Sequence, residues 1–135
     1  MRSGIFRSLL HFKTLVNYRH QVLKQADVVL AMYLRSEHFD LDQRRRNFDY
    51  YDPITTGDSS LSACVQSIVG AQDGADDAAW RHFQDAMRLD LCDTHHNTSE
   101  GIHVANAAGL WAGVVDGFLG MDATAEVPTL NPRLP

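Results

Sequence analysis

Cysteine is scarce in this sequence, and long uncharged apolar runs are absent. The two cysteines, Cys64 and Cys92, form no Cys-x-x-Cys pair and are too few for a disulfide framework. Reduced thiols are the simplest interpretation, so we expect a cytoplasmic protein. The most apolar segment spans residues 104 to 121, but it contains Asn106 and Asp116 and has no basic flanks. It is therefore expected to be a buried helix of a protein with no membrane partner.

Positive charge is also in short supply. The chain carries 12 basic and 17 acidic side chains, which gives a formal net charge of -5. Nucleic acid is bound by clustered positive charge, and the one basic cluster, Arg44-Arg45-Arg46, is expected to be a solvated face. Nucleic acid is therefore excluded as the main partner. Residues 1 to 23 also lack the long apolar core of a signal peptide.

What the sequence does contain is helical periodicity. Hydrophobic residues make up 44% of the 135 residues and charged residues 21%, as in one small globular domain. A chain of this length is able to bury roughly two thirds of its unfolded surface. Apolar residues recur at helical spacing and no segment favours a strand, so the predicted fold class is all-α. The helices are expected over residues 5–16, 21–34, 42–51, 59–71, 76–89 and 102–119.

Two of these helices have patterns that indicate how they pack. In the last helix every fourth residue from Gly109 to Gly117 is glycine, which lets neighbouring helices approach closely. The helix over 76–89 carries two aromatic residues that are most simply core residues. Its inward side is expected at Ala79, Trp80, Phe83, Met87 and Leu91.

Aromatic, turn and hydroxyl residues gather in the stretch from Arg46 to Ser62, which is typical of a binding loop that feeds a helix. Gly57 permits a bend just before Asp58, which we expect to be the N-cap of the following helix. Ser59 and Ser60 would then occupy its first turn, where free backbone N–H groups and two hydroxyls favour an anion such as phosphate. The alternative is an ordinary capped helix whose serines face water.

Two other places carry polar side chains of interest. Lys24 and Gln25 begin a helix with one cation and one amide, a combination suited to sugar hydroxyls, although they are equally interpretable as surface residues. His103 opens the last helix and can donate to an anion through a ring nitrogen, or it is a simple first-turn histidine. His95 and His96 precede it, but no nearby Cys or Glu-x-x-His pattern supports a metal site, so none is expected.

Several segments in order resemble one family. The run from Arg46 to Ser62 is similar to the segment near the end of the catalytic domain of glycoside hydrolase family 65, the family of maltose, trehalose and kojibiose phosphorylases. The resemblance covers about residues 20–135 and leaves residues 1–19 as a poorly matching N-terminal helical segment. The other matching segments are Lys24–Leu30, Ala86–Leu91, Asn97–His103, Gly117–Met121 and Asn131–Pro135.

The resemblance implies a fold and roles for the polar residues. Residues 20–135 would be a C-terminal fragment of the catalytic domain, with the closing helices of a partial (α/α)6 barrel, a double ring of helices around a sugar pocket. Lys24 and Gln25 resemble the pair that binds the transferred glucosyl residue, and Ser59, Ser60 and His103 resemble the residues that hold phosphate. The partners of the complete enzyme would be a disaccharide and phosphate, with phosphate as co-substrate and no other cofactor.

The implied reaction is inverting phosphorolysis of an α-glucosyl disaccharide, which yields β-glucose 1-phosphate. In the family the general-acid glutamate lies upstream of the Lys-Gln pair, in a segment that this chain does not contain. Glu37, Glu100 and Glu126 lie in the wrong motif contexts to replace it. We therefore assign no catalytic residue and expect the isolated chain to be inactive.

Two alternatives stay open. One is that the chain is part of a hydrolase of the same family, although paired hydroxyls at Ser59 and Ser60 favour phosphate over a carboxylate that activates water. It is alternatively a non-catalytic helical remnant or interaction module, and exposed apolar helix faces would then drive self-association. Gly57 and Leu110 depart from the family pattern, which leaves the substrate preference open.

Overall fold

The computed structural model describes residues 13–124 and 126–133. This part of the chain is mostly helical, which confirms the prediction of an all-α fold. Most of the helix expected over 5–16 lies outside the described residues. The elements are α1 (Thr14–Asn17), α2 (Asp27–Leu34), η1 (Ser36–His38), α3 (Leu41–Tyr51), α4 (Ser62–Asp73), α5 (Asp76–Leu91), η2 (Thr98–Glu100), α6 (Val104–Ala112), the π-helical η3 (Gly113–Phe118), β1 (Met121–Asp122) and β2 (Thr129–Leu130).

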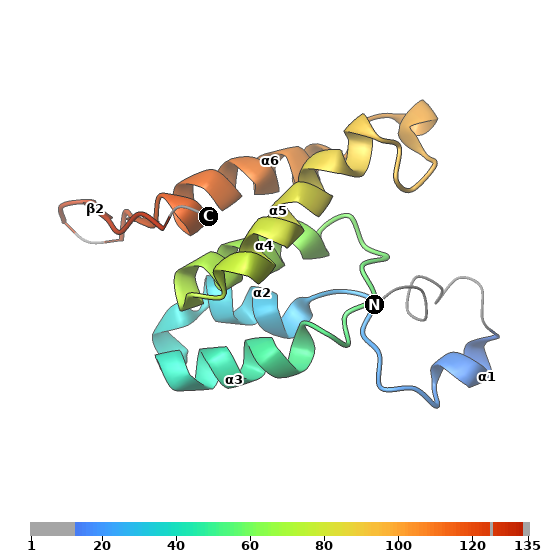
Figure 1. Cartoon of the computed structure of the whole chain (residues 1–135), viewed down its shortest axis with the longest axis horizontal. Coiled ribbons are helices and arrows are strands. Elements are labelled where there is room, and N and C mark those ends of the chain that lie inside the picture. The colour runs from blue at the N-terminus through green and yellow to red at the C-terminus, as the bar shows by residue number, and fades with distance from the viewer. Residues whose placement is uncertain (1–12, 125, 134–135) are drawn as a thin grey trace.

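The long helices form two layers with opposite directions (Figure 1). Helix α2, helix α4 and the continuous α6–η3 segment run one way, and α3 and α5 return. Gly109 of α6 lies against Cys64 at the start of α4, and Gly117 of η3 lies against Ile68 further along α4, so these two segments are parallel. Alternation of this kind is that of a partial double ring of helices, as predicted.

Helix α4 is the centre of the packing. It contacts α2, α3, α5 and α6–η3, and most of its residues are buried. A helix with buried residues on every side is stable only when neighbours cover it all round, and α4 has such neighbours in both layers. On one side Val69 joins a core cluster with residues of α2 and α3; on the other, Ala71 joins a second cluster with residues of α5 and η3. The buried members of the first cluster are Ala26, Val29, Met32, Phe48 and Val69.

The buried face of α5 differs from the predicted one. Ala79 is buried as expected, but Trp80 is 40% exposed and Leu91 is 81% exposed. The buried positions are Ala79, Ala86 and Leu89, and the small side chain of Ala79 lies where α5 is close to α4. Gly70 of α4 shows this closeness, since a Cβ built on it would be 3.2 Å from the Cβ of Ala79. The large aromatic ring at position 80 was a misleading indication of the inward side.

The prediction of a solvated arginine cluster agrees with Arg45 and Arg46, which are exposed, but not with Arg44. Arg44 does not lie on a solvated face, because its side chain is 12% exposed and forms an ion pair of 2.9 Å with Asp73. Its guanidinium also donates to the side-chain oxygen of Gln72. Burial raises the pKa of Asp73, and the charges of Arg44, Arg45 and Arg133 oppose this effect. The cluster therefore anchors α3 to the end of α4.

The described part of the chain ends in a short hairpin. Gly120, with a φ of 60°, turns the chain out of η3. β1 and β2 then pair antiparallel, and the N–H of Arg133 donates to the carbonyl of Phe118. Among the described helices, none has the combination of length and apolar character that spanning a bilayer requires.

Candidate functional site

The two serines lie in a turn before α4 and not within its first turn. Helix α4 begins at Ser62, with Leu61 at the N-cap position and no side-chain cap, so the prediction that Asp58 is the N-cap is wrong. The reason is local hydrogen bonding: the carbonyl of Ser59 accepts from the N–H of Ser62, and its hydroxyl accepts from the N–H of Leu61. Serine competes with helix formation in this way. Ser59 and Ser60 are half-buried in this turn.

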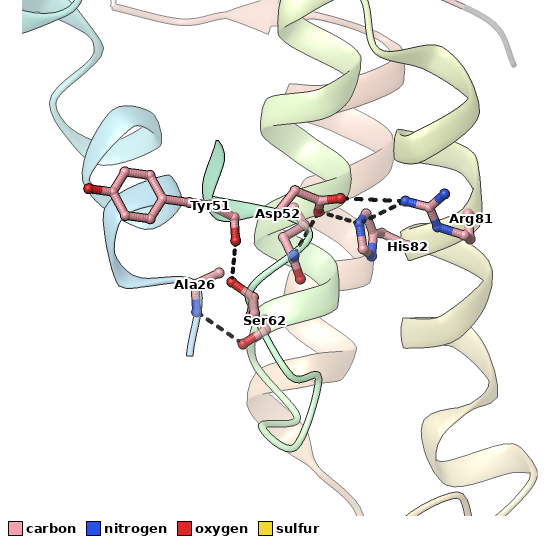
Figure 2. A network of polar contacts seen from close by, with 8 residues as sticks. Ala26, Tyr51, Asp52, Ser62, Arg81 and His82 are labelled. Carbon is pink, nitrogen blue, oxygen red and sulfur yellow. Dashed lines mark hydrogen bonds and ion pairs between the residues drawn. The ribbon is translucent and has the colours of Figure 1, made fainter. Parts of the chain in front are cut away.

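The segment with Lys24 and Gln25 is attached to the same loop. The N–H of Leu23 donates to the carbonyl of Ile54, and the carbonyl of Leu23 accepts from the N–H of Thr56. At the other end of the segment, the N–H of Ala26 donates to the hydroxyl of Ser62 over 3.2 Å (Figure 2). Lys24 and Gln25 are exposed between these two attachments. The structure therefore places the Lys-Gln pair beside the loop that carries the serines.

His103 lies at the N-cap position of α6, and its surroundings are well defined. Its Nδ1 is 2.5 Å from Oδ1 of Asp90, and its backbone N–H donates to Oδ2 of the same carboxylate over 2.9 Å. Its Nε2 is 3.3 Å from Nδ2 of Asn97. The hydrogen bond from His103 is the main cause that lowers the pKa of Asp90. The imidazole is half-buried and held on both sides.

The parallel direction of three helical segments brings these residues to one rim of the molecule. We call this the N-terminal rim and define it by Lys24, Gln25, Ser59, Ser60 and His103. α2, α4 and α6 all begin there, so the positive ends of three helix dipoles face the same side (Figure 1). The partners of His103 found within the described residues belong to α5 and the loop after it, so His103 shares the rim with the serines without a recorded bond to them.

The rim combines groups suited to a sugar and an anion. A lysine ammonium, an amide, two hydroxyls and a histidine supply donors, and the helix starts favour negative charge. In the described part of the chain, no group of three or more His, Cys, Asp or Glu side chains is arranged to hold a metal ion. The ring of His95 lies 6.2 Å from that of His103, edge to face, so it is a neighbour and not a second member of a ligand set.

At the point where the chain leaves α3, Asp52 joins three helices through its carboxylate (Figure 2). It lies at the end of α3, accepts from Gln66 of α4 over 2.8 Å, and is 2.6 Å from Nε2 of His82 on α5. Arg81 adds a longer ion pair of 3.5 Å. Burial acts to raise the pKa of Asp52, but the hydrogen bond and charge of His82 outweigh it, so the pKa is lowered. This network fixes the point at which the chain leaves α3 and enters the loop that carries Ser59 and Ser60.

Sequence reasoning missed Asp90 and Asp52. Asp90 is the penultimate residue of α5, where the helix dipole disfavours an acidic side chain. This unfavourable position was the one sign in the sequence that Asp90 has a partner outside its own helix. Asp52 precedes Pro53, which suggested only the end of a helix. Their partners are 13 and 30 residues away in sequence, so the pairing depends on the tertiary structure.

Comparison with known proteins identifies what the chain resembles. Residues 3–112 match the model of the glycosyl hydrolase family 65 central catalytic domain. The chain is 45% identical over 130 residues to an alpha,alpha-trehalose phosphorylase of Thermoanaerobacter brockii, covering 96% of this chain and 17% of that protein. It is 38% identical to a maltose phosphorylase of Bacillus subtilis, covering 87% of this chain and 16% of that protein.

A solved structure agrees with these matches. The chain superimposes on a candidate kojibiose phosphorylase from the human microbiome with a TM-score of 0.83 and 37% identity, covering 92% of this chain and 16% of that one. The chain thus spans about one sixth of the length of the relatives that it matches. The match to the family model begins at residue 3, and the division of the chain at residue 20 stays a prediction.

Proposed function

The chain belongs to glycosyl hydrolase family 65, and on this basis we propose that it supplies the sugar- and phosphate-binding rim of an enzyme that phosphorolyses an α-glucosyl disaccharide. The relatives named above are phosphorylases of trehalose and maltose. The single observation that carries the proposal is the N-terminal rim, where three parallel helices begin beside lysine, amide, hydroxyl and imidazole donors. The disaccharide and phosphate are its proposed partners.

Each rim residue has a proposed role. Lys24 and Gln25 donate to hydroxyls of the transferred glucosyl residue, and Ser59, Ser60 and His103 hold phosphate by donating to its oxygens. Phosphate attacks the anomeric carbon on the face opposite the leaving sugar, and the product is β-glucose 1-phosphate. Because phosphate is already an anion, the attack needs no general base. It does need a protonated carboxylic acid for the leaving group, and that acid is assigned to no residue of this chain.

A binding experiment tests the phosphate assignment. The purified 135-residue chain is titrated with inorganic phosphate, and amide NMR shifts are followed in the wild type and in a Ser59→Ala, Ser60→Ala variant. We expect saturable shifts in the wild type and a loss of affinity of about tenfold or more in the variant, since each hydroxyl donates to a charged ligand. A matched control removes the exposed hydroxyls of Ser36 and Ser99 and should leave the affinity unchanged. Equal affinity in both double variants would contradict the proposal.

A second experiment tests the inactivity of the chain alone. Purified chain is incubated with phosphate and trehalose, maltose or kojibiose, and glucose 1-phosphate is measured. We expect no product, because the leaving group receives no proton. Turnover by the purified chain would show that a carboxyl group of these 135 residues supplies that proton.

The exposed face of α6 supports a second property, self-association. Val104 and Trp111 are 69% and 65% exposed, and Val114 continues the apolar face into η3. An apolar face of this kind promotes association when nothing covers it. We expect sedimentation to show oligomers that increase with concentration, and a Trp111→Glu variant to remain monomeric. Oligomers without any phosphate binding would favour a non-catalytic module over the enzyme part.

A further inference from the structure

The proposed phosphate contact of His103 depends on which ring nitrogen is available. An ionised carboxylate only accepts hydrogen bonds, so the 2.5 Å contact with Asp90 requires a proton on Nδ1 of His103. Nε2 then points away from Asp90, toward Nδ2 of Asn97 at 3.3 Å. This distance is at the long end for a hydrogen bond, so a phosphate oxygen is able to replace the amide. The ring is thus oriented with Nδ1 bound to Asp90 and Nε2 able to contact a ligand.

The backbone contact restricts the carboxylate as well as the ring. Oδ2 of Asp90 accepts the backbone N–H of His103 over 2.9 Å while Oδ1 faces the imidazole, so one carboxylate holds both parts of the same residue. Asp90 itself is part of the 16-residue helix α5, which is packed against α4. The orientation of the ring is therefore fixed by a long, packed helix and not by the loop that carries His103.

Charge gives the contact a second consequence. A lone carboxylate near the start of α6 would repel phosphate, but an imidazolium at His103 would balance the charge of Asp90. The other titratable groups near this pair in the described residues are Asp93, which acts electrostatically on Asp90, and the ring of His95. When an imidazole is protonated, Nε2 also carries a proton and is a strong donor to an anion.

From these contacts, and resting on the proposed function, we propose that Asp90 is a positioning residue that orients the ring of His103 so that Nε2 faces phosphate.

The test uses the 135-residue chain and a conservative variant. Asp90→Asn retains an oxygen that accepts from Nδ1–H but removes the charge. We expect long-range proton–nitrogen NMR to show the proton of the neutral ring on Nδ1 in the wild type and shared between the two nitrogens in the variant, because a neutral amide holds Nδ1–H less strongly than a carboxylate does. Phosphate affinity should fall about tenfold in the variant. A role in stability alone would not move the proton between the ring nitrogens.

The controls separate the possible failures. Asp85→Asn removes an exposed charge from the same helix and should leave both the position of the ring proton and the affinity unchanged. If the wild type binds phosphate and Asp90→Asn binds it equally, the role of Asp90 is refuted and the proposed function stands. If the wild type binds no phosphate, the proposed function fails and the role of Asp90 with it. If Asp90→Asn does not fold, the wild-type spectrum decides: a neutral His103 that carries its proton on Nε2 refutes the proposal.

Discussion

Substitution of Gly109 by alanine should destabilise the chain because α6 and α4 approach most closely there. A Cβ built on Gly109 would lie 2.8 Å from the Cβ of Cys64 and still closer to its sulfur. Ordinary van der Waals contact begins at 3.4 Å, so the overlap is 3.4 minus 2.8, or 0.6 Å. Cys64 cannot easily yield, since it is buried and its thiol donates to the carbonyl of Leu61 over 3.2 Å.

The magnitude follows from two opposing effects. Overpacking of this kind costs about 1–3 kcal/mol, whereas alanine in place of glycine gains about 1 kcal/mol of helix propensity. Gly113 offers a matched control in the same continuous helical segment, because its Cβ would be 3.3 Å from the ring of Phe83, which overlaps by only 0.1 Å, the difference between 3.4 and 3.3 Å. The propensity gain cancels between the two variants. Gly109→Ala should therefore be less stable than Gly113→Ala by about 1–3 kcal/mol.

Urea denaturation followed by far-UV circular dichroism measures this difference. We expect the free energy of unfolding to be lower for Gly109→Ala than for Gly113→Ala with similar m-values. Adding Cys64→Ala removes the sulfur, and should return part of the lost stability of Gly109→Ala as a positive coupling in a double-mutant cycle. If Gly109→Ala is as stable as Gly113→Ala, the two helices do not approach at Gly109 as described.

Three further predictions concern titratable side chains and their partners. Asp52→Asn should cost about 1.5–3 kcal/mol of unfolding free energy at pH 7. Because the pKa of Asp52 is lowered in the folded state, its contribution to stability is present above the unfolded-state pKa and is lost as the pH falls through the folded-state pKa. Urea curves of the wild type and the variant should therefore differ less at pH 3. Arg44→Met should cost about 3 kcal/mol by leaving Asp73 buried without its ion pair. Acidification should restore part of the lost stability, since protonation of Asp73 removes the charge. Burial and then Asp116 raise the pKa of Tyr33 to about 12, so ultraviolet titration should show one tyrosine ionising last, and earlier in Asp116→Asn; an unchanged titration would contradict this contact.

The sequence predicts helices and a polar loop before a helix because both depend on local patterns. Apolar spacing indicates the helices, and serines beside glycine indicate a loop near a helix start. The exact start of α4 was wrong by three residues because hydrogen bonds of Ser59 with Leu61 and Ser62 extend the turn. Periodicity does not reveal how side chains compete locally for backbone groups.

Longer-range features were less accessible. The inward face of α5 was misplaced because close packing against Gly70 favours the small side chain of Ala79, whereas Trp80 lies at a partly exposed position. The pairing of Asp90 with His103 crosses a loop of polar residues, and nothing in the local pattern joins them. Residue types predict which elements form, whereas partners across elements require the spatial arrangement.

The π-helical segment η3 has a consequence for the register of the chain. Its wider turn, closed by a bond from the N–H of Leu119 to the carbonyl of Val114, holds one residue more than an α-helical turn. Without that residue, everything after it would rotate by about 100°. Phe118 would leave its edge-to-face contact with Phe83, and Asp116 would no longer face the hydroxyl of Tyr33. A single added residue, absorbed within one turn, thus lets the same segment meet α2 and α5 at once.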